Sequence, residues 1–190
     1  MVRLFIAARL DAPALEYTSA VESELRRRLR GRMRLRWTSA AGRHITLAFL
    51  GETAEADLAA ISSSMDSAAA RFAPFDVSVG SPGVFPPTGR GRVLWLGIDD
   101  PSGNLASLAL ELKRELGARG FGFEKRDFVA HVTLGRSKDR RGFDSSVIDD
   151  LPGPACVSFA VDRIILFESR LSSSGSRYLV RHTSLLGDTG

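Results

Sequence analysis

The chain has 190 residues, of which 44% are hydrophobic and 25% charged, and its formal net charge is +4. This composition is that of an ordinary globular protein and excludes global disorder, and the length indicates one domain with a real core. The single cysteine, Cys156, excludes an intramolecular disulfide framework. Its apolar surroundings predict a small buried residue, with a nucleophile as a remote second choice.

The N-terminal segment is apolar but short. Arg9 and Asp11 follow too early for a signal-peptide core, and no run approaches the roughly 18 apolar residues that a membrane span needs. We therefore expect a cytoplasmic protein without a membrane partner. Arginine supplies almost all of the positive charge, which adds some weight to phosphate-bearing partners because its planar fork suits phosphate.

The first half of the chain predicts alternating strands and helices. The expected elements are a strand at Val2–Ala8, a helix from Pro13 to about Leu29, a short strand at Arg34–Thr38, a strand at His44–Leu50 ended by Gly51, a helix capped by Thr53 and running to about Arg71, and a strand at Phe75–Val79.

The second half begins with a segment rich in Gly and Pro that predicts a loop. The expected elements are that loop at Gly80–Gly91, a strand at Val93–Ile98, a helix from Ser102 to Leu116 or Arg119, a strand at His131–Arg136, a polar loop at Ser137–Ser146, and strands near Val161–Glu168 and Tyr178–Thr183. This irregular order favours an α+β fold with largely antiparallel sheets over a doubly wound parallel sheet. The sequence has no Gly-rich phosphate loop, C-x-x-C pair or H-E-x-x-H helix, so it supports neither ATP binding nor a zinc site, and we expect no metal and no cofactor.

One short pattern occurs twice. His44-Ile-Thr46-Leu opens one predicted strand and His131-Val-Thr133-Leu opens another, although the chain has only three histidines. Residues i and i+2 of a strand point to the same face, so each histidine shares a face with its threonine. If both strands line one cleft, two imidazoles and two hydroxyls meet there.

Such a set suits phosphodiester cleavage. The nucleophile enters and the leaving oxygen departs on opposite sides of phosphorus, so two proton-transfer groups are needed, and histidine titrates near neutral pH. The hydroxyls of Thr46 and Thr133 can donate hydrogen bonds to the non-bridging oxygens. A 2′,3′-cyclic phosphate is strained, which makes catalysis without a metal plausible.

The sequence resembles the 2H phosphoesterase superfamily. HITLAFLGE from His44, HVTLGR from His131, and the segments RLFIAARL, GVFPPTGRGRVLWLGI and VDRIILFESRLSSSGSRYLV are similar to its RNA 2′,3′-cyclic phosphodiesterase (2′-5′ RNA ligase) branch, and together they span nearly the whole chain. The resemblance implies two pseudo-symmetric α/β lobes around a central cleft. It also implies one domain over residues 1–190, made of two interleaved lobes that each contribute one motif.

The activity implied by the resemblance is hydrolysis of a terminal 2′,3′-cyclic phosphate on RNA or nucleotides to a 2′-phosphomonoester, by a monomer. His44 would be the proton donor and His131 the proton acceptor, an order that the residues alone leave open. The reverse reaction would be a 2′-5′ ligation without ATP. Phe49 and Arg136 would contact substrate, although strict strand alternation points both away from the catalytic face, so a bend must re-aim them.

Other interpretations stay open. The substrate could be a 2′-5′ oligonucleotide or an ADP-ribose cyclic phosphate, or the chain could be a non-catalytic module that binds RNA ends. His182 lacks the threonine offset and predicts a structural or surface residue. The arginine-rich stretch 26–36 indicates a solvated helix end more than an RNA-binding surface, and Lys138, Arg140 and Arg141 predict a basic loop that could contact RNA.

Overall fold

The computed structural model describes residues 1–31, 33–123, 127–148, 157–172 and 175–187. Its α-helices are α1 (Ala12–Arg28), α2 (Leu58–Ala69) and α3 (Asn104–Ala118). Its strands are β1 (Val2–Ala8), β2 (Leu35–Trp37), β3 (Ile45–Thr53), β4 (Phe75–Phe85), β5 (Arg90–Gly91), β6 (Val93–Asp99), β7 (His131–Ser137), β8 (Phe143–Asp144), β9 (Ser158–Val161), β10 (Arg163–Ser172) and β11 (Gly175–Leu185).

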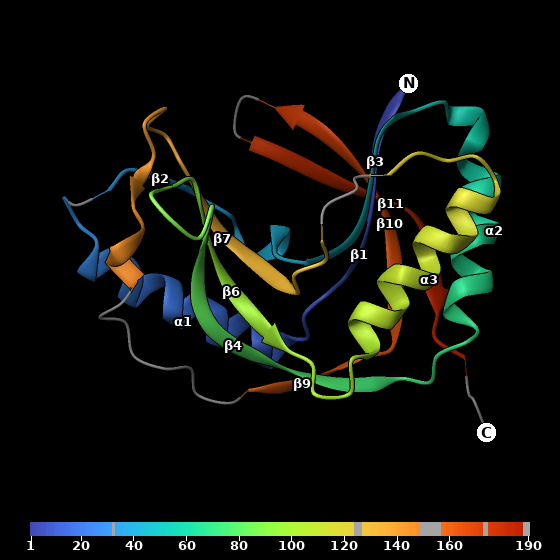
Figure 1. Cartoon of the computed structure of the whole chain (residues 1–190), viewed down its shortest axis with the longest axis horizontal. Coiled ribbons are helices and arrows are strands. Elements are labelled where there is room, and N and C mark those ends of the chain that lie inside the picture. The colour runs from blue at the N-terminus through green and yellow to red at the C-terminus, as the bar shows by residue number, and fades with distance from the viewer. Residues whose placement is uncertain (32, 124–126, 149–156, 173–174, 188–190) are drawn as a thin grey trace.

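One curved sheet of 9 strands runs through the molecule. Its order is β11-β10-β1-β3-β7-β6-β4-β9, with β2 also paired to β7, and the described strand pairs are antiparallel. The strands β3 and β7 are central and join through a single residue pair, Ile45 opposite Val132. This narrow junction divides the sheet into two lobes, which face each other across the centre in Figure 1.

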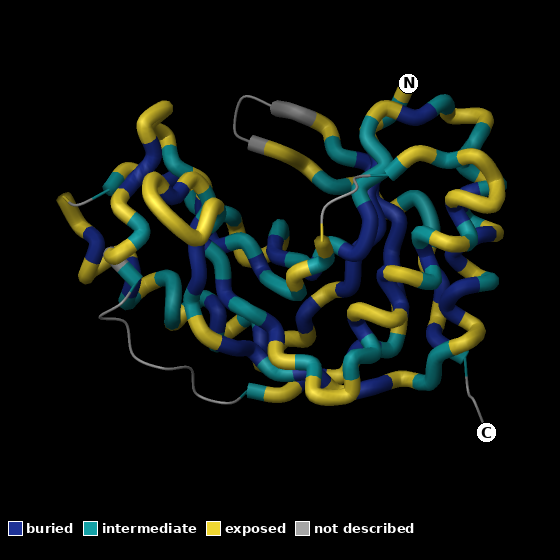
Figure 2. Tube along the Cα trace, viewed as in Figure 1, coloured by how far each residue is buried: buried dark blue, intermediate teal, exposed yellow. Residues whose placement is uncertain are grey.

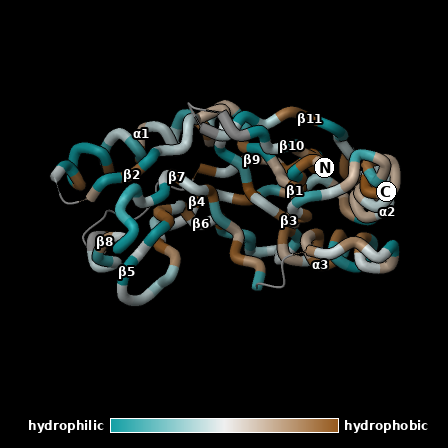
Figure 3. Tube along the Cα trace, turned by 90° about the horizontal axis from the view of Figure 1, so that it is seen from above, coloured by the Kyte–Doolittle hydropathy of each residue, from teal (hydrophilic) through white to brown (hydrophobic). Residues whose placement is uncertain are grey.

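The helices cover the sheet from its outer side. The helices α2 and α3 pack against each other and against β3, β10 and β11, whereas α1 packs beside β9 in the other lobe. Figure 3, seen from above, shows the same separation of α1 from α2 and α3. The helix α1 thus follows β1 in the chain but packs beside β9, the strand that pairs with β4.

Two groups of buried apolar side chains lie on opposite faces of the sheet. The larger group joins the strands to all three helices, and the dark strands in Figure 2 mark its position. The smaller group consists of Phe5, Ala7, Ile165 and Phe167, from β1 and β10. It forms the floor of the concave face, which none of the three described α-helices covers, and this face is therefore open for a site.

The helix α1 shows how local sequence fixes an element. The carboxylate of Asp11 accepts a hydrogen bond from the Ala14 amide at 2.8 Å, and a proline stands at the start of the helix. Arg26, Arg27 and Arg28 lie in the last turn, where cations favour the helix dipole. The arginine-rich stretch thus begins as a solvated helix end, and these arginines form ion pairs with acids of the same helix.

The predicted fold class is confirmed: the protein is α+β, with two lobes and antiparallel pairing. The prediction that Gly51 ends the third strand is wrong, because pairing with β1 continues to Val2 opposite Thr53. The backbone of Gly51 adopts a φ of 71°, which lets the strand turn without stopping. The predicted cap at Thr53 is also wrong, since this residue ends β3 and Asp57 precedes α2.

The prediction of a loop at Gly80–Gly91 is wrong for the first half of that segment and for Arg90–Gly91, which forms β5. The strand β4 continues through it to Phe85, which lies opposite Val93. A register shift between Val79 and Pro82 accommodates the proline, which cannot donate a ladder hydrogen bond. Gly83 is required by packing, because a Cβ there would lie 2.1 Å from the Trp95 ring.

Two other boundaries differ from expectation. The single strand predicted near Val161–Glu168 is two strands, β9 and β10, which separate at Asp162 and pair with different lobes. The polar loop after β7 contains the short strand β8, which pairs with β5. Cys156 lies outside the described residues.

Candidate active site

The two repeated motifs meet at the junction of β3 and β7. Ile45 lies opposite Val132 in antiparallel register, and both side chains are fully buried on the helix-covered face. The residues on either side of each therefore point to the concave face. This register places the four side chains of the two His-x-Thr pairs together.

The convergence produces a small pocket of about 100 Å³. It is lined by the four motif residues His44, Thr46, His131 and Thr133. The other lining residues come from the segment before β3, from β7 and from β11, namely Thr38, Gly42, Arg136 and Tyr178. The expectation that two imidazoles and two hydroxyls share one cleft is met by this geometry. A group the size of a phosphate fits the dimensions and polarity of such a space.

A register shift follows each motif. In β3, Thr46 lies opposite Ala7, but Phe49 lies opposite Phe5, so Leu47 is the extra residue of a bulge. Residues 5 and 7 of β1 share a face, and Phe49 therefore lies on the same face as Thr46. It packs beside the small buried group on the floor of the site.

The second motif repeats this arrangement. Thr133 lies opposite Trp95 and Arg136 lies opposite Val93, with the register shifted between the two pairs. Arg136 is thereby turned to the face of Thr133 and lines the small pocket. Each strand thus contains the bend that was needed to overcome simple alternation, and Phe49 and Arg136 both reach the concave face.

Both imidazoles are oriented by the backbone that precedes them. Nδ1 of His44 lies 2.8 Å from the Gly42 carbonyl oxygen, and Nδ1 of His131 lies 2.7 Å from the Val129 carbonyl oxygen. A carbonyl only accepts, so each Nδ1 carries the proton and donates. The Nε2 atom of each neutral ring is left as the one that exchanges a proton.

Aromatic rings surround each imidazole. The rings of Phe5 and Tyr178 lie 4.8 and 5.2 Å from that of His44, and the rings of Phe85 and Trp95 lie 5.0 and 5.8 Å from that of His131, between centroids. These apolar walls disfavour a charged ring.

Burial lowers the pKa of His44 to about 4, and the positive charges of His131 and Arg136 act in the same direction, whereas the bond to Gly42 opposes them. Burial also lowers the pKa of His131. At neutral pH both rings are therefore uncharged in the free protein, and each offers a lone pair at Nε2.

This shift predicts a dependence of stability on pH. Because the folded chain binds the His44 proton less readily than the unfolded chain, the free energy of unfolding should rise with pH between about 4 and 6.5. Protonation of His44 alone should lower the free energy of unfolding by about 2 kcal/mol between pH 7 and about pH 4.5. Urea unfolding of the wild type and of His44→Gln at both pH values measures this difference. An equal loss in both proteins would contradict the assignment.

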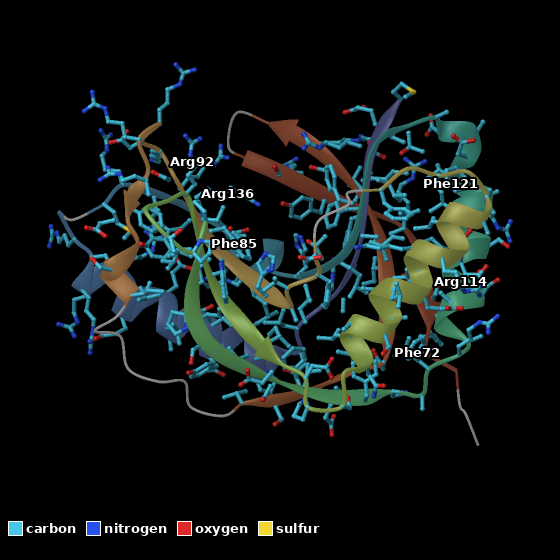
Figure 4. All side chains as sticks on the ribbon, in the orientation of Figure 1. Phe72, Phe85, Arg92, Arg114, Phe121 and Arg136 are labelled. Carbon is cyan, nitrogen blue, oxygen red and sulfur yellow. The ribbon has the colours of Figure 1, made fainter. Side chains whose placement is uncertain are left out.

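A larger pocket of about 600 Å³ adjoins the small one and shares Thr46, His131 and Arg136 with it. Phe49, Phe85 and Phe128 contribute aromatic side chains to its walls, and Figure 4 shows Phe85 beside Arg136. Flat apolar walls next to a polar pocket suit a molecule that carries both a planar ring and a phosphate.

Sequence reasoning missed three residues of the small pocket, of which Gly42 stands two positions before His44. Thr38 comes from the segment after β2, and Tyr178 comes from β11, where its ring contacts His44 edge-on. Neither residue has a local motif. The signal that could have identified Tyr178 is its place in the last of the segments that resemble the family, VDRIILFESRLSSSGSRYLV.

The remaining candidates lie elsewhere or face away. Nε2 of His182 donates to the Asp66 carboxylate at 2.7 Å, between β11 and α2, as expected for a structural residue. Gly135 faces β2, and a Cβ there would lie 3.3 Å from the Arg36 carbonyl oxygen. Its small size therefore serves strand packing and leaves the substrate face unchanged.

Among the residues that the structure describes, no three His, Cys, Asp or Glu side chains gather in a group that could hold a metal ion. Within the same residues, no helix is both long and apolar enough to cross a membrane.

The doubled motif, the shared pocket and the antiparallel two-lobed sheet define a two-histidine phosphoesterase fold. The family model for the 2′-5′ RNA ligase superfamily matches residues 18–172, and the chain belongs to this family. The match contains both motifs and both bulges.

Comparisons with individual relatives agree with this family assignment. The chain is 32% identical to a Thermotoga maritima protein over 179 residues, covering 94% of this chain and 92% of the relative, and that protein is named RNA 2′,3′-cyclic phosphodiesterase. A Methanothermobacter thermautotrophicus protein of the same name is 30% identical and covers 93% and 95%. The crystal structure of Escherichia coli LigT with 3′-AMP superposes with a TM-score of 0.73 at 26% identity and covers 98% of each chain.

Proposed function

We propose that this protein is an RNA 2′,3′-cyclic phosphodiesterase that hydrolyses a terminal 2′,3′-cyclic phosphate to a 2′-phosphomonoester. The observation that carries the proposal is the single pocket of about 100 Å³ in which both His-x-Thr pairs meet. The names of the relatives support the same substrate class. The proposal covers residues 1–190 as one domain with two interleaved lobes, acting as a cytoplasmic monomer.

In this mechanism His131 is the proton acceptor. Its Nε2 lone pair takes a proton from water, and the hydroxide attacks phosphorus. The bond between phosphorus and the 3′ oxygen breaks, and Nε2 of His44 donates a proton to that oxygen. Water and the cyclic phosphate thus yield a 2′-phosphate and a 3′-hydroxyl, and the two histidines exchange roles in the reverse direction.

His44 must hold a proton before it can donate one. Burial lowers its pKa to about 4. A phosphate anion between the two rings favours the imidazolium and so opposes that shift. Substrate binding therefore favours protonation of His44, and the proton that the ring takes up is the one that it later donates. The hydrogen bond from Nδ1 to the Gly42 carbonyl holds the ring in place in both its neutral and its protonated form.

The remaining site residues stabilise charge and bind substrate. The hydroxyls of Thr46 and Thr133 donate hydrogen bonds to the non-bridging oxygens as negative charge grows. The guanidinium of Arg136 binds phosphate or base, and the ring of Phe49 contacts the base. The strained five-membered ring supplies part of the driving force, so the proposal includes no metal and no cofactor. With the 5′-hydroxyl of a second RNA in place of water, the same ring opening would join the two ends through a 2′-5′ bond without ATP, and the 3′ oxygen would again leave.

The test is hydrolysis of cyclic-ended RNA and of 2′,3′-cyclic nucleotides with EDTA present. We expect turnover in EDTA with a 2′-phosphate product, identified by its chromatographic mobility against both isomers. Loss of turnover in EDTA would overturn the metal-free mechanism. A 3′-phosphate product would exchange the roles of His44 and His131, and binding without turnover would identify a non-catalytic module. Turnover of only 2′-5′ oligonucleotides or ADP-ribose cyclic phosphate would reassign the substrate, and size-exclusion chromatography of the same sample tests the monomer.

A further inference from the structure

Arginines at the junction of β2, β6 and β7 differ from the ion-paired arginines elsewhere in the chain. Many arginines form ion pairs with carboxylates within 4.0 Å, namely Arg26, Arg27, Arg28, Arg43, Arg71, Arg114, Arg163, Arg170 and Arg181. In the part of the chain that the structure describes, Arg36, Arg92 and Arg136 have no such partner. We call these three exposed residues the arginine rim.

Two members of the rim face each other directly. Arg36 on β2 lies opposite Arg136 on β7 in antiparallel register, so both side chains project from the same face. Like charges in this position destabilise a sheet, and no acid among the described residues offsets them. The face is that of the site, because Thr38, two residues after Arg36, lines the small pocket together with Arg136. An anion between or above the two guanidinium groups would relieve this repulsion.

The third member is held in place by the backbone. Nη2 of Arg92 donates to the Arg140 carbonyl oxygen at 2.9 Å, and its own amide donates to the Phe85 carbonyl oxygen. The loop that supplies this carbonyl carries three further exposed cations, Lys138, Arg140 and Arg141. The Asp139 carboxylate in the same loop accepts from the Arg141 amide at 2.8 Å, which leaves the loop predominantly positive.

The rim borders the candidate active site on one side. Arg92 lines the larger pocket, and Arg136 lines both pockets. Figure 4 shows Arg92 and Arg136 close together beside Phe85, whereas Arg114 lies at the far end of the molecule on α3. This edge offers a path for an RNA whose terminal phosphate occupies the small pocket and whose last nucleoside fills the larger one.

Resting on the proposed function, we infer that the arginine rim binds the phosphodiester backbone of a single-stranded RNA upstream of its cyclic end. The substrate class is therefore an RNA chain end, in preference to a free cyclic mononucleotide. A groove of unpaired cations beside aromatic walls is the arrangement that single-stranded nucleic acids require. A mononucleotide that fills the two pockets reaches Arg92 and Arg136, which line them, but not Arg36.

The test compares two substrates with one double variant. For Arg36→Gln with Arg92→Gln, kcat/KM for a cyclic-ended RNA of about six nucleotides should fall at least tenfold, since two charged groups that bind phosphate are removed. The same constant for a 2′,3′-cyclic mononucleotide should fall much less, and in the single variant Arg36→Gln, at a residue that lines neither pocket, it should change less than about twofold. A matched control, Arg114→Gln with Arg163→Gln, removes the same charge from surface ion pairs elsewhere and should leave both constants near the wild-type values.

Salt dependence gives a second measurement. The slope of log kcat/KM against log salt for RNA should become shallower by about 0.7 for each phosphate that the double variant no longer binds. Binding of a fluorescent RNA with a 2′-phosphate end, followed by anisotropy, should weaken in parallel. Equal effects on RNA and mononucleotide, or no effect on RNA binding, would overturn the inference. If the wild-type protein hydrolyses neither substrate, the proposed function fails. The anisotropy measurement still tests whether the arginine rim binds RNA.

Discussion

Replacing His131 by alanine is expected to lower kcat/KM for cyclic-ended RNA by about 10³–10⁴-fold, and His44→Ala by a similar factor. Each change removes an Nε2 atom that exchanges a proton, and no other imidazole among the described residues lines the pocket. Initial rates at neutral pH measure both effects. In the double variant the loss should be much smaller than the product of the two single losses, because the histidines act as a unit.

His182→Ala provides the control. This third histidine bonds to Asp66, outside the site, and its removal should leave the rate within about twofold. Circular dichroism of every variant at the assay temperature verifies that it is folded. A His131→Ala protein that retains more than a tenth of the wild-type rate would exclude that residue as the acceptor and would return the question to Tyr178 and Arg136, which line the same pocket.

The sequence predicted the parts of this site that depend on the alternation of side chains between the two faces of a strand. Both His-x-Thr pairs stand at or just before the start of a strand, and burial of Ile45 and Val132 sends their neighbours to the other face. Alternation alone placed Phe49 and Arg136 on the wrong face. The two register shifts that correct this depend on pairing with β1 and β6, which no local sequence window contains.

Contacts between distant segments account for the rest. Tyr178 lies 134 residues after His44, by their numbering, and reaches it because β11 extends the sheet through β10. The opposition of Arg36 and Arg136 depends on β2, a strand of 3 residues whose partner could not be assigned from its pattern. The segment rich in Gly and Pro is a strand in its first half for a related reason. Gly83 is present because Trp95 packs on it, and it does not break the strand.

The two motifs are supported differently at the residue before each histidine. That residue is Arg43 in the first motif and Ala130 in the second. The Arg43 side chain is only 1% exposed and extends to α1, where it pairs with Glu22 and donates to Thr18 and Ser19 at 2.9 and 2.8 Å. Its Nε has no partner among the described residues, and burial lowers the pKa of the guanidinium, opposed by Glu22.

Arg43→Met should therefore reduce the free energy of unfolding by about 3 kcal/mol, because a charge partner is removed from a buried cluster. In this variant Thr18 and Ser19 still donate hydrogen bonds to the Leu15 carbonyl, and Glu22 still forms an ion pair with Arg26. The expected loss of stability is therefore at the low end of the range for broken buried ion pairs. Urea unfolding at neutral pH measures it. A loss below about 0.5 kcal/mol would mean that the desolvation of Arg43 cancels its favourable interactions.

A second substitution separates charge burial from positioning. Arg43→Met combined with Glu22→Met should recover most of the lost stability, since an apolar pair of similar volume often replaces a buried ion pair at no cost. The kcat of this stable double variant should nevertheless stay lowered, because the guanidinium that ties the Gly42–His44 backbone to α1 is gone and the Gly42 carbonyl orients the His44 ring. The matched change at the other motif, Ala130→Met, removes no such tether. If the double variant instead turned over at the wild-type rate, the cluster would act on stability alone, and the Nδ1 bond to Gly42 would suffice to hold the proton donor.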